Sequence, residues 1–238
     1  MLSNFEKSKK KQIIVLQWLA KFGFSTRDIL CDVLQLNYQG QNGFFNLMVR
    51  DKVVEEQYIA GTRRKILTLG KAAYDILSIH FPEMKIKKTR TFPLYTLIHS
   101  FSIQKFLISQ KGSENFFSES ELADKKFHRR PDLLILNEHG SKIAVEVELT
   151  RKSSDRIYHI YRSLSRDWSD GKFDHVIFLF SSPAVLEQYK ELYENTVWPE
   201  FKNNEGRGKK LIRVGSFDPA NVHSHGLIIF HQFEPYSL

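Results

Sequence analysis

The stretch KIAVEVELTRKS, residues 142–153, places two acids in a run that is otherwise apolar. Successive side chains of a β-strand point to opposite faces, so Glu146 and Glu148 share one face with Ala144 and Thr150. Like charges this close raise each other's pKa unless water, a cation or a metal ion lies between them. Two interpretations are open: an antiparallel strand with one solvated face, or a site that uses the paired carboxylates.

A second apolar run, RRPDLLILN, lies just upstream and carries Asp132 at its start. If the two runs form an antiparallel hairpin folded near His139, the numbers of paired residues sum to roughly 278, which sets Asp132 beside Glu146. Glu148 then lies one side-chain repeat away, and three carboxylates converge. Hard divalent cations such as Mg²⁺ are held by carboxylates together with water and phosphate oxygens. The hairpin therefore predicts a metal site suited to phosphoester chemistry.

The composition is that of a folded protein, with 42% hydrophobic and 13% aromatic residues in a chain of 238. The single cysteine, Cys31, cannot form an internal disulfide, and no Cys/His cluster has the spacing of a zinc site. No apolar segment has the length of a signal peptide or a membrane span. These features predict a cytoplasmic protein with no membrane insertion.

Positive charge is concentrated in the first part of the chain. Residues 1–91 hold 16 Lys or Arg against 8 Asp or Glu, whereas residues 92–238 hold 19 of each. This asymmetry predicts two domains, at residues 1–82 and 93–238, joined by a charge-rich linker at residues 83–92. It also predicts nucleic acid as the partner of the first domain, with a generally basic soluble domain as the alternative.

The first part shows three amphipathic segments, at residues 8–23, 25–36 and 40–52, followed by two short strand-like runs around GTRR. This order resembles a winged helix-turn-helix, most closely across residues 43–77. The resemblance implies base contacts from the recognition helix and phosphate contacts from the wing. The expected DNA-binding residues are Asn46, Arg50 and Lys52 on or after the helix, and Arg63, Arg64 and Lys65 in the wing. A winged helix that binds protein is the alternative.

The second part is predicted to run helix, three strands, helix, strand, with a further helix from Pro183. The motif Pro131-Asp132, thirteen residues, then Glu146-Val147-Glu148 resembles the signature of the PD-(D/E)xK nuclease superfamily, whose core has this αβββαβ order. The expected fold class is therefore α/β (α+β), a winged helix-turn-helix followed by a nuclease-like domain. Glu148 stands where the superfamily usually has lysine, as in some restriction endonucleases.

The resemblance implies a role for each polar residue. Asp132 and Glu146 would hold Mg²⁺ or Mn²⁺, and Glu148 would orient or deprotonate the attacking water. Lys152 would supply the displaced cation, with a solvated lysine as the alternative. His99 and Glu119 would complete the site, although an ordinary structural histidine is the alternative for His99.

A tyrosine nucleophile is not expected. Tyr161 falls on the apolar stripe of the helix after the acidic strand, which indicates a core position. No tight cluster of three histidines accompanies it, so direct hydrolysis by activated water is the expected reaction.

The two predicted domains together resemble the replication-relaxation group, and within it the MobC-type plasmid relaxases. The resemblance rests on LTLG, His99, RPD, VEVELT and the helix that carries Tyr161. It implies nicking of one strand at an origin of transfer, with plasmid DNA, a coupling protein and other relaxosome components as partners. Two alternatives stay open: a non-catalytic winged-helix regulator of plasmid replication or transcription, and a restriction-type nuclease that cuts both strands.

Overall fold

The computed structural model describes residues 3–87, 93–110, 115–203 and 210–237 of a mixed α/β chain. Contacts group the chain into two units, one formed by residues 1–111 with 236–238 and the other by residues 112–235. No helix within the described residues is both long enough and apolar enough to cross a membrane.

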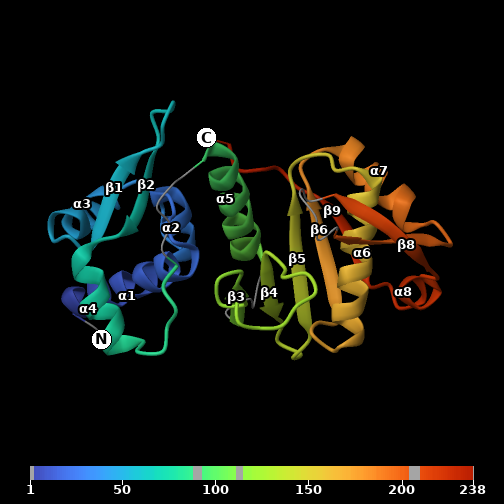
Figure 1. Cartoon of the computed structure of the whole chain (residues 1–238). Helices are drawn as coiled ribbons and strands as arrows, with labels where there is room; N and C mark the ends of the chain where they lie inside the picture. The colour runs from blue at the N-terminus through green and yellow to red at the C-terminus, as the bar shows by residue number, and fades with distance from the viewer. Residues whose placement is uncertain (1–2, 88–92, 111–114, 204–209, 238) are drawn as a thin grey trace. The chain divides into compact units, whose positions relative to one another are not determined.

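The first unit consists of helices around one short hairpin (Figure 1). Its elements are α1 (Asn4–Phe22), α2 (Arg27–Val33), α3 (Asn42–Arg50), β1 (Val54–Tyr58), β2 (Lys65–Leu69), α4 (Lys71–His80) and α5 (Leu94–Ser109). Strands β1 and β2 pair antiparallel, and Ser25 adds an isolated bridge to Leu67. The predicted order of three helices, a hairpin and a helix is confirmed.

Local sequence sets the limits of α1. Ser3 and Glu6 form a reciprocal capping box at its start, before the predicted segment, and Gly23, the predicted stop, ends it in the left-handed conformation at φ 85°. Ile14, which the sequence places beside the apolar residues of this helix, is 42% exposed. Thr26 is the N-cap residue of α2, but its side chain makes no capping hydrogen bond.

A buried glutamine ties α5 to the rest of the first unit. The Gln104 side-chain oxygen accepts hydrogen bonds from Trp18 Nε1 at 2.8 Å and Ser25 Oγ at 2.7 Å, and its nitrogen donates to the Phe24 carbonyl at 3.1 Å. The sequence had placed α5 at the start of the second domain, whereas contacts group it with the first unit. Of the predicted linker, residues 83–87 form neither helix nor strand, and residues 88–92 lie outside the described residues.

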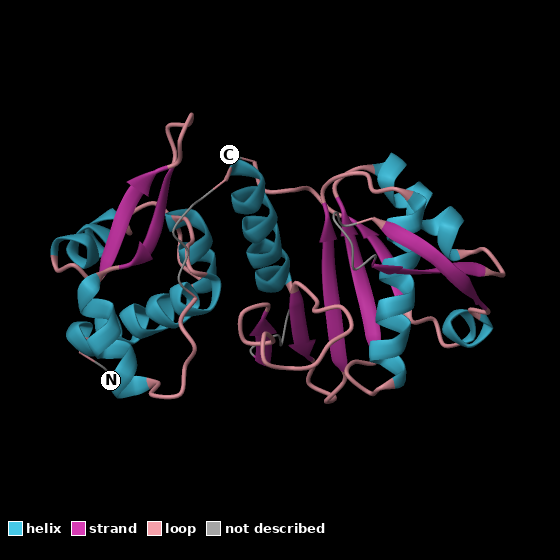
Figure 2. Cartoon of the chain, viewed as in Figure 1, coloured by secondary structure: helices cyan, strands magenta, loops and turns pink. Residues whose placement is uncertain are grey.

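The second unit is built on a mixed sheet (Figure 2). Its elements are β3 (Asn115–Ser118), β4 (Leu133–Leu136), β5 (Lys142–Glu148), α6 (Ser154–Ser169), β6 (His175–Phe180), α7 (Pro183–Tyr193), β7 (Trp198–Asn203), β8 (Leu211–Phe217), α8 (Ala220–Ser224) and β9 (Ile228–Gln232). The sheet order is β3-β4-β5-β6-β9, antiparallel from β3 to β5 and parallel from β5 to β9. Strands β7 and β8 form a separate antiparallel pair.

The predicted hairpin register is confirmed, since Leu133 lies opposite Val145 and Leu136 opposite Lys142. Helix α6 then makes the crossover that the parallel pairing of β5 and β6 requires. The predicted apolar stripe of this helix packs with Ala144 of β5 and Phe178 of β6. Four of its residues are buried and the fifth, Trp168, is partly buried; the four are Ile157, Ile160, Tyr161 and Leu164.

Candidate active site

Three carboxylates lie on the face of the sheet that α6 and α7 cover. Glu146 and Glu148 share this face with the core residue Ala144, and both are only 1% exposed. Continuing the β4–β5 register by one residue places Asp132 opposite Glu146. The solvated-strand interpretation is therefore wrong, because the acids point into the protein.

Asp132 is fixed across the hairpin by backbone groups of β5. Its own N–H donates to the Val145 carbonyl at 3.1 Å, and its Oδ2 accepts the Val147 N–H at 2.8 Å. The carboxylate thus takes a hydrogen bond from the strand that carries Glu146 and Glu148. A side chain held in this way has a defined orientation before any ligand binds.

Arg129 provides the counter-charge for Glu146. Its Nε donates to Glu146 Oε1 at 3.1 Å, and a terminal nitrogen donates to Oε2 at 2.5 Å, a two-point geometry matched to a carboxylate. The same terminal nitrogen lies 4.0 Å from Glu148 Oε1. A buried acid on α6, Asp167, fixes the preceding backbone by accepting the His128 and Arg129 N–H groups, each at 2.8 Å.

Glu148 pairs with Lys152 through one oxygen only. Lys152 Nζ donates to Glu148 Oε2. The other oxygen, Oε1, is buried and has no hydrogen-bond partner of ordinary geometry among the described residues. The Tyr189 hydroxyl is a buried neighbour, and desolvation together with the Glu148 charge raises its pKa, so it stays protonated. A buried carboxylate oxygen that lacks a hydrogen bond within the described residues leaves room for a further ligand or cation in the site.

The electrostatics of the cluster differ from those of a surface ion pair. Burial raises the pKa of Glu146 to about 7, and the charges of Asp132 and Glu148 add to this rise, while Arg129 opposes it. A carboxyl group with this pKa changes protonation near neutral pH.

The structure brings together four of the predicted site residues: Asp132, Glu146, Glu148 and Lys152. Glu119 was expected on a strand, but β3 ends at Ser118 and Glu119 is exposed in the following turn. Glu121 accepts the Ser118 N–H at 2.8 Å and closes that turn.

His99 does not belong to the unit that holds the carboxylates. It lies on α5 of the first unit, partly buried, with its ring stacked 6.2 Å from that of Tyr95 between centroids. Tyr161 is a core residue as predicted, since it is fully buried and its hydroxyl donates to the Tyr189 carbonyl at 2.7 Å.

Sequence reasoning missed Arg129, Asp167 and Tyr189. The only signal for Arg129 was a cation three residues before the acid of the motif. Asp167 and Tyr189 gave none, because their contacts to the site depend on how α6 and α7 pack.

Carboxylate oxygens are the ligand type that a hard divalent cation prefers. Glu146 and Glu148 lie on one sheet face, and the β4–β5 register continued by one residue puts Asp132 opposite Glu146. Among the described residues, the group of three that does have its ligand atoms within 4.8 Å of one another is His128, Asp167 and Asp170. Both Asp167 oxygens there accept backbone N–H groups, so that group serves to position Arg129.

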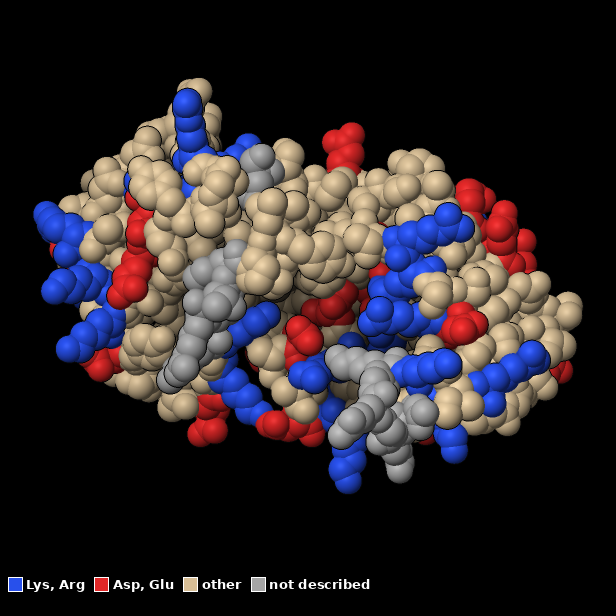
Figure 3. Space-filling view, turned by 45° about the horizontal axis from the view of Figure 1, so that its top comes forward, with Lys and Arg blue, Asp and Glu red and all other residues tan. Residues whose placement is uncertain are grey.

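The expected DNA-binding residues all lie on the first unit, where basic side chains project around the tip of the β1–β2 hairpin (Figure 3). Asn46 is exposed on α3, and Arg50 ends that helix with a 2.9 Å ion pair to Asp51. Lys52 follows at a left-handed φ of 55°. The remaining three are exposed: Arg63 and Arg64 in the β1–β2 loop, and Lys65 at the start of β2.

Comparison with protein-family models gives no match for this chain. Comparisons with curated proteins and with solved structures give no match either.

Proposed function

We propose that the chain is a metal-dependent DNA endonuclease. The observation that carries the proposal is the pair of buried acids Glu146 and Glu148 on one sheet face, with the register putting Asp132 opposite Glu146 and with one Glu148 oxygen lacking a hydrogen bond within the described residues. Burying two acids beside a third is unfavourable unless cations compensate for them, and phosphodiester hydrolysis is a reaction that a bound metal cation assists.

In this proposal Asp132 and Glu146 hold Mg²⁺ or Mn²⁺, and Glu148 Oε1 is left for the attacking water. The bound ion supplies Lewis-acid polarisation of the phosphate and activation of water for attack. Asp132 is oriented for this role by the Val147 N–H, and Glu148 receives a proton from the attacking water. Arg129 and Lys152 reduce the repulsion among the acids and stabilise negative charge that develops on the phosphate.

The first unit supplies the DNA-binding surface in the proposal, as a winged helix-turn-helix. Helix α3 carries Asn46 and Arg50 toward base edges, and the β1–β2 loop carries Arg63 and Arg64 toward phosphates. Together with the sequence resemblance to MobC-type relaxases, this favours nicking of one strand at a plasmid's origin of transfer, in the cytoplasm, with a coupling protein and other relaxosome components as partners.

The test is incubation of the purified protein with supercoiled plasmid that carries its own origin region, in MgCl₂, MnCl₂ or EDTA. We expect nicked circles only with a divalent cation, and none from the Glu146→Gln variant. Glu138→Gln is the matched control, because Glu138 is exposed in the β4–β5 turn of the same hairpin. Linear product would indicate double-strand cleavage, and no product under any condition would contradict the enzyme.

A specific observation also favours a second candidate, a non-catalytic DNA-binding regulator. Arg129 and Lys152 already pair with Glu146 and Glu148, so the carboxylates are partly neutralised without a metal. A wild type that binds origin DNA but leaves it intact with both cations would support this candidate.

A further inference from the structure

Arg27 donates a hydrogen bond to the side-chain oxygen of Asn46. Arg27 begins α2, and its side chain is 17% exposed. Its two terminal nitrogens donate to Asn42 Oδ1 at 3.2 Å and to Asn46 Oδ1 at 3.0 Å, and its Nε donates to Glu56 Oε1 at 2.9 Å. Because a guanidinium has only donors, the atom of each amide that faces it must be the oxygen.

The position of Arg27 is set from three elements of the first unit. One carboxylate oxygen of Glu56, on β1, accepts a hydrogen bond from Arg27 Nε. The other oxygen accepts from Lys65 Nζ at 2.7 Å. The ring of Phe45 lies 5.7 Å from the guanidinium carbon. Arg27 thus links α2, α3 and the hairpin, and has little freedom to release the asparagine.

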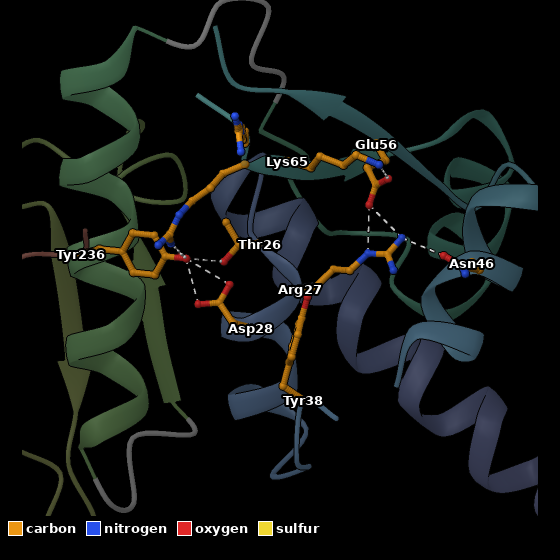
Figure 4. Close-up of a pocket in the computed structure, with 10 residues that line it drawn as sticks. Thr26, Arg27, Asp28, Tyr38, Asn46, Glu56, Lys65 and Tyr236 are labelled. Carbon is orange, nitrogen blue, oxygen red and sulfur yellow. Dashed lines mark hydrogen bonds and ion pairs between the residues drawn. The ribbon is translucent and has the colours of Figure 1, made fainter. Parts of the chain in front are cut away.

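Asn46 lines a cavity of about 650 Å³ in the first unit, with its side-chain oxygen toward Arg27 (Figure 4). Lys65, Arg63 and Arg64 also line this cavity, which gives it an excess of positive charge. With Oδ1 engaged by a cation, approach of a second N–H donor to that oxygen is disfavoured. The two N–H bonds of Asn46 remain available to an acceptor.

We propose that Arg27 is a positioning residue that makes Asn46 a donor-only reader of the major groove, selective for the acceptor edge of guanine. An unconstrained asparagine pairs with adenine by accepting from N6 and donating to N7. Guanine offers two acceptors, N7 and O6, and needs no acceptor from the protein. The inference rests on the proposed DNA binding by the first unit and names the base that its helix reads.

The test compares two variants that add the same charge beside the same guanidinium, Asn46→Asp and Asn42→Asp. Each carboxylate still accepts from Arg27, but aspartate at position 46 has no donor left. Full-length protein in EDTA selects sites from a randomised duplex library, and fluorescence anisotropy then compares each guanine with 7-deazaguanine, which lacks the N7 acceptor.

Wild type should enrich a site in which one guanine is sensitive to 7-deaza substitution, with a discrimination of about 5- to 150-fold, the range of a bidentate base contact. Binding by Asn46→Asp should no longer be sensitive to 7-deaza substitution. Asn42→Asp should bind all sequences more weakly but should keep the sensitivity to 7-deaza substitution. Arg27→Lys keeps the charge but leaves one point donor in place of the guanidinium fork, so it should reduce the discrimination.

The inference is overturned if Asn46→Asp enriches the same guanine, or if wild type enriches an adenine at the position that Asn46 contacts. A wild type that binds duplexes without base preference also overturns it and leaves the endonuclease proposal standing. A protein that nicks plasmid but loses no discrimination in Arg27→Lys assigns Arg27 a structural role alone.

Discussion

Each unit contains a cluster of paired charges, and the two clusters differ in which charge is in excess. In the first unit Glu56 pairs with two cations, Arg27 and Lys65, at the surface of a cavity. In the second unit three carboxylates lie near two cations, Arg129 and Lys152, and two of the acids, Glu146 and Glu148, are almost fully buried. The first arrangement leaves positive charge for a polyanion, and the second leaves negative charge for a cation.

Because the acids Glu146 and Glu148 of the second cluster are buried, breaking its ion pairs should strongly reduce the stability of the fold. Buried charges lose hydration, so each depends on its partners, whereas exposed pairs are screened by water and salt. Changes in the second unit should therefore alter stability and catalysis strongly, and changes in the first should alter mainly affinity and its salt dependence.

The largest effect is expected from Arg129→Met. The change leaves Glu146 buried without its two-point partner, which should lower the free energy of unfolding by about 3 to 5 kcal/mol, the usual penalty for breaking a buried pair. Arg130→Met, at an exposed neighbour, should change it by less than about 0.5 kcal/mol. Urea denaturation measures both. If the double variant Arg129→Met, Glu146→Gln is no more stable than Arg129→Met alone, the pairing is not the cause.

The pKa of Glu146 predicts a pH dependence of stability. Because its pKa rises from 4.5 in the unfolded chain to about 7 in the fold, the folded state binds more protons between these values. Wild type should lose stability relative to Glu146→Gln as pH rises from 4.5 to 7, by about 3 kcal/mol at most, and the difference should then level off. Urea titrations in EDTA measure it. A difference that grows in the opposite direction would mean that Arg129 outweighs burial.

Glu148→Ala tests the carboxylate that stands in the usual lysine position. We expect nicking to slow by at least about a hundredfold, the lower range of a general acid–base contribution. Thr150→Ala, two residues further along the chain and exposed, is the control. An effect below about threefold with a normal fold would assign Glu148 a structural role in balancing Lys152.

Glu56→Gln should have the smallest effect of these variants, and it should strengthen DNA binding rather than weaken it. The change releases Lys65 from its ion pair, which makes one more cation available to phosphates. The slope of log K against log salt should therefore steepen by about 0.9. Removal of Arg63, Arg64 and Lys65 together should instead flatten this slope and weaken binding to all DNA sequences alike. Fluorescence anisotropy across a salt series measures the slope. An unchanged slope in Glu56→Gln would place Lys65 away from the DNA.

The sequence predicted the acidic hairpin because two local signals agreed. Alternation fixed the face of Glu146 and Glu148, and the turn at NEHGSK fixed the register that brings Asp132 opposite. The buried stripe of α6 followed from its period in the same way.

The parts that could not be predicted depend on long-range packing. Arg129 precedes its strand and is oriented by Asp167, 38 residues away. Strand β8 is exposed along most of its length, so it lacks the apolar alternation that marks a strand. The hydrogen bonds of Gln104 reach back 86 residues to Trp18, and nothing local predicts that α5 groups with the first unit.

The division of labour between the two units is tested most directly by measuring binding and nicking on the same preparations of three proteins. The three proteins are wild type, the Asp132→Asn variant, and a double variant that carries both Arg63→Ala and Arg64→Ala. Each protein is titrated against origin duplex and incubated with supercoiled plasmid in MnCl₂. We predict that Asp132→Asn binds like wild type and leaves the plasmid intact, and that the double variant binds weakly but still nicks at high protein concentration. Nicking by Asp132→Asn at the wild-type rate would contradict the carboxylate site.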